Sequence, residues 1–139
     1  MQSIIKNEFE EHYITSISSL KSNAKTIEIA AKICIECLRG GNKLLIFGNG
    51  GSAAISSHFS VDMTKIGQIR TVNFNESDLL TCFSNDYGYE NWVKKCIEFY
   101  SDKGDMIILI SSSGESKNMI NAAKTSKKKK IKNNNIHGL

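Results

Sequence analysis

The sequence predicts a parallel α/β sheet covered by helices, and three observations support that fold class. Continuous apolar runs at residues 43–47 and 105–110 have the length and composition of strands buried on both faces. Longer stretches with apolar residues at three- and four-residue steps alternate with these runs, as helices would. A glycine-rich or serine-rich turn follows each run. Strands that alternate with helices imply parallel strands joined by right-handed crossovers.

Two amphipathic helices are predicted to lead the chain. Residues 4–20 and residues 22–38 each place apolar side chains at helical spacing. Gly40 and Gly41 follow the second stretch, where a left-handed residue commonly ends a helix.

The remaining elements follow from local signals along the chain. Ser52 and Ser116 can cap helices that begin after the two turns. The polar segment NDYG at residues 85–88 reads as a loop between two helical stretches. The expected order is a strand at 43–47, a helix at 52–65, a strand at 69–74, helices at 76–84 and 89–100, a strand at 105–110 and a helix at 116–126.

Length and composition predict one domain at residues 1–126, with helices at 1–40 and an α/β core at 43–126. The chain has 139 residues, 40% of them hydrophobic and 23% charged, which is typical of a soluble globular protein. No apolar run approaches the ~18–20 residues that a membrane span needs. The first residues lack the basic-then-apolar layout of a secretion signal. We therefore expect a cytoplasmic protein with no membrane partner.

The positive net charge comes from the end of the chain. Residues 127–132 hold five of the 18 basic residues, so the rest of the chain has 13 basic against 14 acidic residues. A nucleic-acid interface would spread basic residues over a folded face and interleave them with aromatics. We therefore expect no nucleic-acid partner and a disordered Lys- and Asn-rich tail at residues 127–139.

The four cysteines are those of a protein in a reducing compartment. Cys34 and Cys37 have CxxC spacing, which zinc and redox sites also use. They lie in a helical pattern without a second CxxC or a nearby histidine pair, so two ordinary buried thiols are expected.

The glycine turn, residues 48–52 (GNGGS), is the first candidate binding segment. Glycines let the backbone approach a ligand and expose N–H groups, and the following helix adds a partial positive end. The pattern is neither the GxGxxG of dinucleotide sites nor a P-loop with its lysine. A small phosphate-bearing ligand is therefore favoured over a nucleotide, and a purely structural turn is the alternative.

The serine turn, residues 111–116 (SSSGES), is the second candidate. Hydroxyls and backbone amides converge there at a helix start without a lysine or arginine. Such a turn can bind phosphate through hydrogen bonds and the helix dipole. The alternative is a serine-rich loop in which Ser113 or Ser116 caps the helix.

Together these motifs resemble the sugar isomerase (SIS) domain. The resemblance rests on GNGGS after the first strand, His58-Phe59 on the next helix, NDYG in mid-chain and a strand ending in SSSGES, and it covers nearly all of residues 1–126. Within that family the chain is similar to the phosphoheptose isomerases, which convert sedoheptulose 7-phosphate to heptose 7-phosphate. It is also similar to a replication-initiation regulator of the same subfamily.

The resemblance implies a flavodoxin-like three-layer α/β/α fold, a tetramer and active sites between subunits. By motif position it implies a sugar site, further substrate contacts and a phosphate site. These are formed, in that order, by Asn49, Gly50, Gly51 and Ser52; by Asn85 and Asp86; and by Ser111, Ser112, Ser113 and Ser116.

The resemblance also implies a zinc site at His58 and Asp62. In the family a histidine and a glutamate four residues later bind zinc from one helix face, and the glutamate takes part in proton transfer. Here Asp62 stands at the glutamate position, so it is the family-matched catalytic base. Its carboxylate is set back by about one methylene, which disfavours proton transfer.

The family pattern continues beyond the serine turn and its helix, with two more strands and a helix that carries a glutamine and a histidine. This sequence turns to lysine and asparagine instead, and a frameshift in a run of lysine codons is our hypothesis for the change. In a sheet of order 2-1-3-4-5, the strand at 105–110 would then be a bare edge. We expect a phosphosugar-binding relative of the isomerases that is inactive alone, with an incomplete zinc site. A non-catalytic, regulator-like binding module is the alternative.

Overall fold

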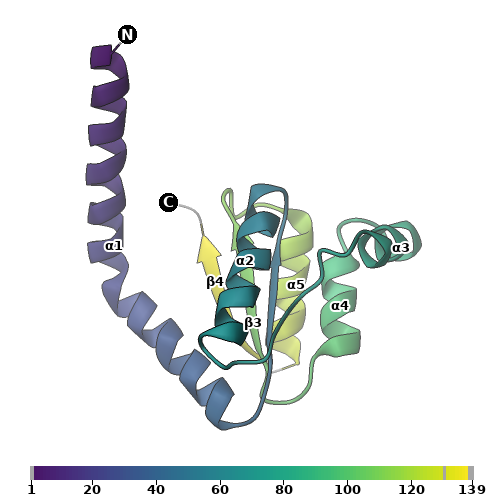
Figure 1. Ribbon diagram of the computed structural model, residues 1–139. Helices are drawn as coiled ribbons and strands as arrows, with labels where there is room; N and C mark the ends of the chain where they lie inside the picture. Colours follow the sequence, from purple (N-terminus) through teal and green to yellow (C-terminus); the bar gives the residue numbers. More distant parts are fainter. Residues whose placement is uncertain (1, 130, 138–139) are drawn as a thin grey trace. The chain divides into compact units, whose positions relative to one another are not determined.

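A four-stranded parallel sheet forms the centre of the structure, a computed structural model that describes residues 2–129 and 131–137 (Figure 1). The strands lie in the order β2-β1-β3-β4. Their bounds are β1 Leu44–Gly48, β2 Thr71–Asn73, β3 Met106–Ser111 and β4 Lys132–His137. This order confirms the predicted flavodoxin-like sheet, because the chain begins at an inner strand, moves to one edge and then returns past it.

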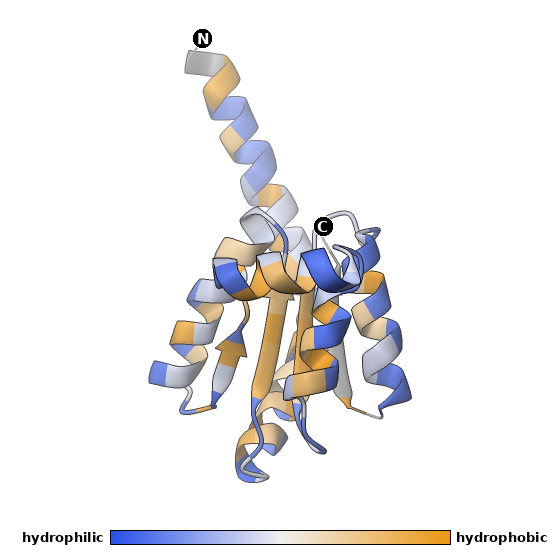
Figure 2. Ribbon diagram, turned by 90° about the vertical axis from the view of Figure 1, so that its right-hand side faces the viewer, coloured by the Kyte–Doolittle hydropathy of each residue, from blue (hydrophilic) through white to orange (hydrophobic). Residues whose placement is uncertain are grey.

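Helices pack on both faces of the sheet, as the prediction of three layers requires (Figure 2). The helices are α1 Gln2–Arg39, α2 Gly51–Lys65, α3 Ser77–Tyr87, α4 Trp92–Tyr100 and α5 Lys117–Lys128. The last turns of α1 and helix α2 contribute to one buried cluster, whereas α4 and α5 contribute to the other.

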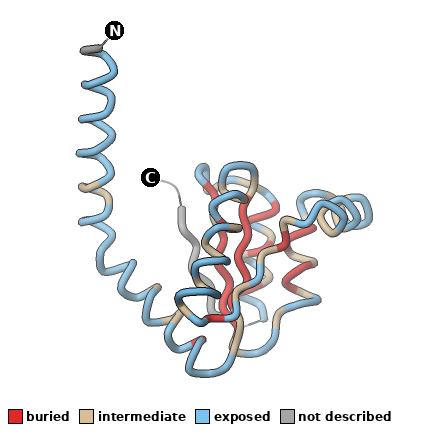
Figure 3. Tube along the Cα trace, in the orientation of Figure 1, coloured by how far each residue is buried: buried red, intermediate tan, exposed pale blue. Residues whose placement is uncertain are grey.

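The two inner strands are buried on both faces because their side chains alternate between the two clusters (Figure 3). Leu45 and Phe47 pack with α4 and α5, whereas Leu44 and Ile46 pack with α1 and α2. The same alternation runs along β3. The ring of Phe47 stacks on Phe74 at 4.9 Å and meets Trp92 edge-on at 6.1 Å.

The N-terminal part of the chain differs from the predicted pair of helices, because α1 is continuous over 38 residues. Neither glycine nor proline interrupts it near residue 21. Asn23, at the expected break, donates its side-chain amide to the Ser19 carbonyl and so stays within the helix. Residues 2–32 form a separate compact unit in which many apolar side chains are exposed, among them Phe9 and Tyr13. No helix in the described part of the chain is long and apolar enough to cross a membrane.

The C-terminal part also differs from the prediction, which placed a disordered tail after residue 126. Helix α5 continues to Lys128, where cations suit the negative end of the helix dipole. Strand β4 then pairs in parallel with β3 along its whole length, from Met106↔Lys132 to Ser111↔His137. Ile131, which is buried in the core, anchors the entry to β4. A ladder uses backbone groups, so polar residues can form it, and β3 is an inner strand instead of the predicted edge. The tail's residues 130, 138 and 139 lie outside the described residues.

Element boundaries in the middle of the chain shift by a few residues. The predicted loop at 85–88 is helical through Tyr87, and Gly88 ends α3 with a φ of 82° that favours glycine. Helix α4 begins at Trp92, three residues later than predicted, and β2 keeps only the centre of the predicted strand at 69–74.

A buried carboxylate ties together the amino ends of β1 and β3. Asp105 is 1% exposed and accepts hydrogen bonds from the backbone N–H groups of Lys43, at 2.9 Å, and Asp102, at 2.7 Å. The Lys43 ammonium lies 2.7 Å from its second oxygen and 2.5 Å from the Asp102 carboxylate. The hydrogen bond and charge of Lys43 lower the pKa of Asp102. This cluster fixes the register of the two strands at their amino ends, and the functional turns follow at their carboxyl ends.

We predict that Asp105→Ala lowers the free energy of unfolding by about 3–5 kcal/mol, because it leaves two backbone N–H groups and an ammonium without their buried partner. Urea denaturation followed by circular dichroism measures the change. Lys103→Ala, an exposed change in the same turn, should alter stability by less than about 0.5 kcal/mol. Equal stability of the two variants would contradict the assigned role of Asp105.

Candidate functional site

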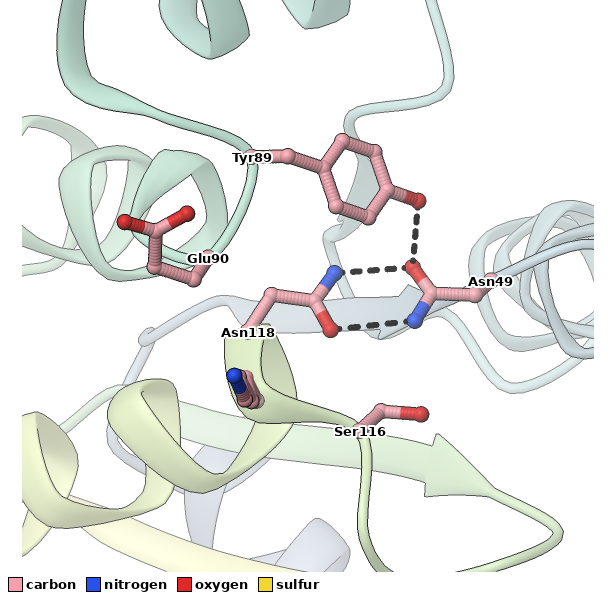
Figure 4. Close-up of a pocket in the computed structure, with 6 residues that line it drawn as sticks. Asn49, Tyr89, Glu90, Ser116 and Asn118 are labelled. Atoms are coloured by element: carbon pink, nitrogen blue, oxygen red, sulfur yellow. Dashed lines mark hydrogen bonds between the residues drawn. The ribbon is translucent and has the colours of Figure 1, made fainter.

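A cavity of about 290 Å³ lies where the glycine turn meets the start of α5 (Figure 4). Both turns follow the carboxyl ends of neighbouring parallel strands, the edge where such sheets bind ligands. The cavity is lined by Asn49, Tyr89, Glu90, Ser116, Lys117 and Asn118. The structure therefore brings one residue of each predicted turn, Asn49 and Ser116, to one place.

The glycine turn is shaped by backbone geometry that side chains would obstruct. Gly50 precedes α2 with a φ of 53°. A Cβ on Gly48 would overlap the backbone carbonyl group of Ser52, whereas a Cβ on Gly51 would meet nothing within 4 Å. The Ser52 N–H donates to the Asn49 carbonyl at 2.9 Å, which closes the turn and leaves the Asn49 side chain at the cavity.

The serine turn uses two of its hydroxyls to hold its own shape. The Ser111 hydroxyl accepts from the Gly114 N–H at 3.1 Å, and the Ser113 hydroxyl accepts from the Glu115 N–H at 3.2 Å. Ser116 stands at the N-cap of α5 without making a side-chain capping hydrogen bond, and its hydroxyl accepts from the Ser111 hydroxyl at 3.4 Å. Of the four predicted phosphate-site serines, Ser116 is the one that lines the cavity.

Two asparagines join the glycine turn directly to the first turn of α5. The Asn49 amide donates to the Asn118 side-chain oxygen at 3.0 Å, and the Asn118 amide donates to the Asn49 oxygen at 2.8 Å. The Tyr89 hydroxyl donates to the same Asn49 oxygen at 3.1 Å (Figure 4). Asn118 is 2% exposed and Asn49 is half-buried, so the pair is shielded from water on the Asn118 side and holds the glycine turn against α5.

Sequence reasoning missed four of the cavity residues: Tyr89, Glu90, Lys117 and Asn118. Lys117 and Asn118 directly follow Ser116 in the first turn of α5, so a rule that searched the whole first helical turn would have included them. Tyr89 and Glu90 follow the NDYG motif, but their side of the cavity depends on how α4 packs on α5, which no local pattern encodes.

His58 and Asp62 share one face of α2, as their spacing predicts. Nε2 of His58 lies 3.6 Å from Oδ2 of Asp62, and both side chains are exposed, by 81% and 50%. Neither residue lines the cavity. Zinc takes three or four protein ligands in most sites. Within the described residues no group of three His, Cys, Asp or Glu side chains could hold a metal, so this pair alone does not complete a zinc site.

Asn85 and Asp86 lie in the last turn of α3 and are exposed. The Asn85 amide donates to the Asp86 carboxylate at 3.0 Å. That carboxylate also lies 3.6 Å from the Cys82 thiol and raises its pKa. Neither residue lines the cavity, so their predicted substrate contacts stay predictions.

The two cysteines of the CxxC spacing contact different partners. The Cys34 thiol lies 3.6 Å from the Met106 sulfur, and the Cys37 thiol donates to the Lys43 carbonyl at 3.3 Å. Burial raises the pKa of Cys34, and it raises the pKa of Cys96 to about 12. Protonated thiols are poor nucleophiles and poor metal ligands.

Sequence comparison assigns the class of protein that this fold and cavity define. The SIS domain family matches residues 8–133, and the chain belongs to that family. The phosphoheptose isomerase of Aliarcobacter butzleri is 38% identical over 135 residues, covering 91% of this chain and 70% of the relative. That of Campylobacter concisus is 34% identical over 136 residues, covering 92% of this chain and 70% of the relative.

Solved structures agree with these matches. The phosphoheptose isomerase of Neisseria gonorrhoeae superimposes with a TM-score of 0.91 at 30% identity, covering 99% of this chain and 75% of that one. A phosphoheptose isomerase from Francisella tularensis gives a TM-score of 0.89 at 24% identity, covering 100% of this chain and 75% of that one. The second match supports the fold alone.

The glycine turn offers a matched pair of substitutions. We predict that Gly48→Ala destabilises the protein by about 1–3 kcal/mol, because the added Cβ would overlap the Ser52 backbone. Gly51→Ala should leave the thermal midpoint unchanged or slightly raised, because its Cβ enters open space at the start of α2. Differential scanning calorimetry measures both. A stable Gly48→Ala variant would show that the turn is looser than described.

Proposed function

We propose that this protein binds a phosphorylated sugar in the cavity between the glycine turn and α5, as an isomerase of the phosphoheptose type. The observation that carries the proposal is the meeting of Asn49 and Ser116 in one cavity at the carboxyl edge of the sheet. The names of the related isomerases support the reaction, interconversion of sedoheptulose 7-phosphate and heptose 7-phosphate. They favour an enzyme over the regulator-like binding module.

The phosphate would bind at the α5 end of the cavity. Helix α5 has 12 residues, so its first N–H groups and its dipole present a stable partial positive charge. Ser116 adds a hydroxyl, and Lys117 brings a full positive charge to the cavity lining. The cavity volume of about 290 Å³ is at the lower limit for ligand pockets, which suits a small ligand better than a nucleotide.

The reaction needs a base that moves a proton between adjacent carbons and donors that stabilise the enediol oxygen. The Asn49 amide is placed to donate to such an oxygen. For the base we keep Asp62, which stands where the family has glutamate. In one chain Asp62 lies on the exposed face of α2, outside the cavity lining.

A second copy of the chain would complete the site in this proposal. Apolar side chains are exposed beside His58 and Asp62 on α2, namely Ile55 at 58% and Val61 at 56%. Residues 4–32 of α1, by themselves, also carry exposed apolar side chains. Large apolar surfaces of this kind are typical of contacts between chains. Tetramer formation and a cytoplasmic location stay predictions.

The phosphate assignment predicts the behaviour of Ser116. Replacing it by alanine should weaken the binding of sedoheptulose 7-phosphate by about tenfold or more, because one hydrogen bond to a charged ligand is worth about 1.5–3 kcal/mol. Isothermal titration calorimetry measures the affinity. Ser77→Ala, at the exposed start of α3, is the matched control and should bind as the wild type does. Equal affinity of all three proteins would reject the phosphate site.

The base assignment predicts opposite effects for two changes at Asp62 in the assembled protein, whereas a single chain, whose site is incomplete, is still expected to be inactive. Asp62→Asn should lower kcat by ~10²-fold or more, because an amide cannot accept the proton. Asp62→Glu should raise kcat above that of the parent chain, because the extra methylene restores the reach of the carboxylate. A coupled assay of heptose 7-phosphate formation follows both. Loss of activity in Glu90→Gln, with activity kept in Asp62→Asn, would move the base to the cavity wall.

A further inference from the structure

Most of the donor and acceptor positions of the Asn49 carboxamide are already engaged within the protein. The position that remains decides which ligand groups Asn49 can bind. A carboxamide oxygen accepts two hydrogen bonds and its nitrogen donates two. The Asn49 oxygen already accepts from the Asn118 amide at 2.8 Å and from the Tyr89 hydroxyl at 3.1 Å. Its nitrogen donates to the Asn118 oxygen at 3.0 Å. Within the described residues, one N–H of Asn49 is left for a ligand.

The orientation of the pair is fixed from within α5. The Asn118 oxygen also accepts from the Met119 backbone N–H at 3.0 Å. A backbone N–H can only donate, so the oxygen of Asn118 must occupy that position, and its NH₂ group must face Asn49. Turning both amides together would place two donors against each other at Met119. Asn118 therefore sets which end of Asn49 carries the oxygen.

We propose that Asn118 is a positioning residue that, together with Tyr89, locks the Asn49 carboxamide so that it offers a ligand one N–H donor and no acceptor. Asn49 would then bind an oxygen that accepts, such as a sugar hydroxyl, a carbonyl or a phosphate oxygen. The burial of Asn118 keeps water from its side of the pair, whereas Tyr89 is 52% exposed. The chemical identity of the ligand as a phosphosugar rests on the function proposed above, but the locked amide does not.

A double-mutant cycle tests whether the two residues act through Asn49. Asn118→Ala should weaken the binding of sedoheptulose 7-phosphate by about tenfold and Tyr89→Phe by about threefold, both measured by calorimetry. Neither change should have a further effect in an Asn49→Ala background. Tyr100→Phe, whose ring packs on Phe74 away from the cavity, is the control for the tyrosine change and should bind normally. Independent, additive losses would overturn the inference, because they would mean that Asn118 and Tyr89 act without Asn49.

A second measurement keeps the inference separate from the proposed function. In the ligand-free protein, nuclear magnetic resonance should show through-space contacts from the Asn49 side-chain amide to both the Asn118 amide and the Tyr89 ring. In the folded Tyr89→Phe variant the Asn49 amide signals should shift while the contact with Asn118 persists. Absence of the Asn49–Asn118 contact in the wild type would overturn the locked amide. If the contact is present but no phosphosugar binds, the proposed function fails and the positioning role of Asn118 stands.

Discussion

The parallel pairing of β1 with β3 is the constraint on which the rest of the structure depends. Its register, from Leu44↔Met106 to Gly48↔Ile110, fixes both where the sheet begins and where its two turns emerge. At the amino ends, the Asp105 carboxylate accepts from the Lys43 backbone and so opposes slippage of one strand along the other. A shift of one residue would move every side chain of the shifted strand from one buried cluster to the other, where it would have to pack against different helices. The hydrophobic layers and the polar cluster therefore specify the same register.

The cavity is a consequence of that register. Strands in parallel end at the same edge, so the glycine turn after β1 and the serine turn after β3 must emerge side by side. The asparagine pair then connects the two segments without a charged group, which leaves Lys117 as a positive charge at the cavity and Glu90 as a negative one. A neutral link is well suited to this position, because a charged pair there would interact with the phosphate of the proposed ligand.

Most of the fold could be predicted from the sequence, because apolar runs and their spacing report burial directly. The boundaries were less predictable. Nothing local separates a helix break near residue 21 from a continuous α1, and the lysine- and asparagine-rich segment gave no apolar signal for β4. That strand depends on its partner, since β3 offers an open row of backbone groups to any extended segment. Of the predicted site, Asn49 and Ser116 reach the cavity, whereas Tyr89 and Asn118 come from packing between distant segments.

The arrangement also separates two kinds of residue that a motif treats alike. The hydroxyls of Ser111 and Ser113 accept hydrogen bonds from backbone N–H groups of their own turn, so they stabilise the shape of the loop. Ser116 makes no side-chain capping bond and lines the cavity; its hydroxyl accepts from Ser111, and its own O–H remains to donate to a ligand. Asn49 and Asn118 differ in the same way. Asn118 is buried and fixes the orientation of the Asn49 side chain, whereas Asn49 is half-buried and lines the cavity. The SSSGES motif therefore contains both hydroxyls that shape the turn and one that a ligand could reach, whereas Asn49 of GNGGS is held by a residue outside its motif, and hydrogen-bond partners distinguish these roles.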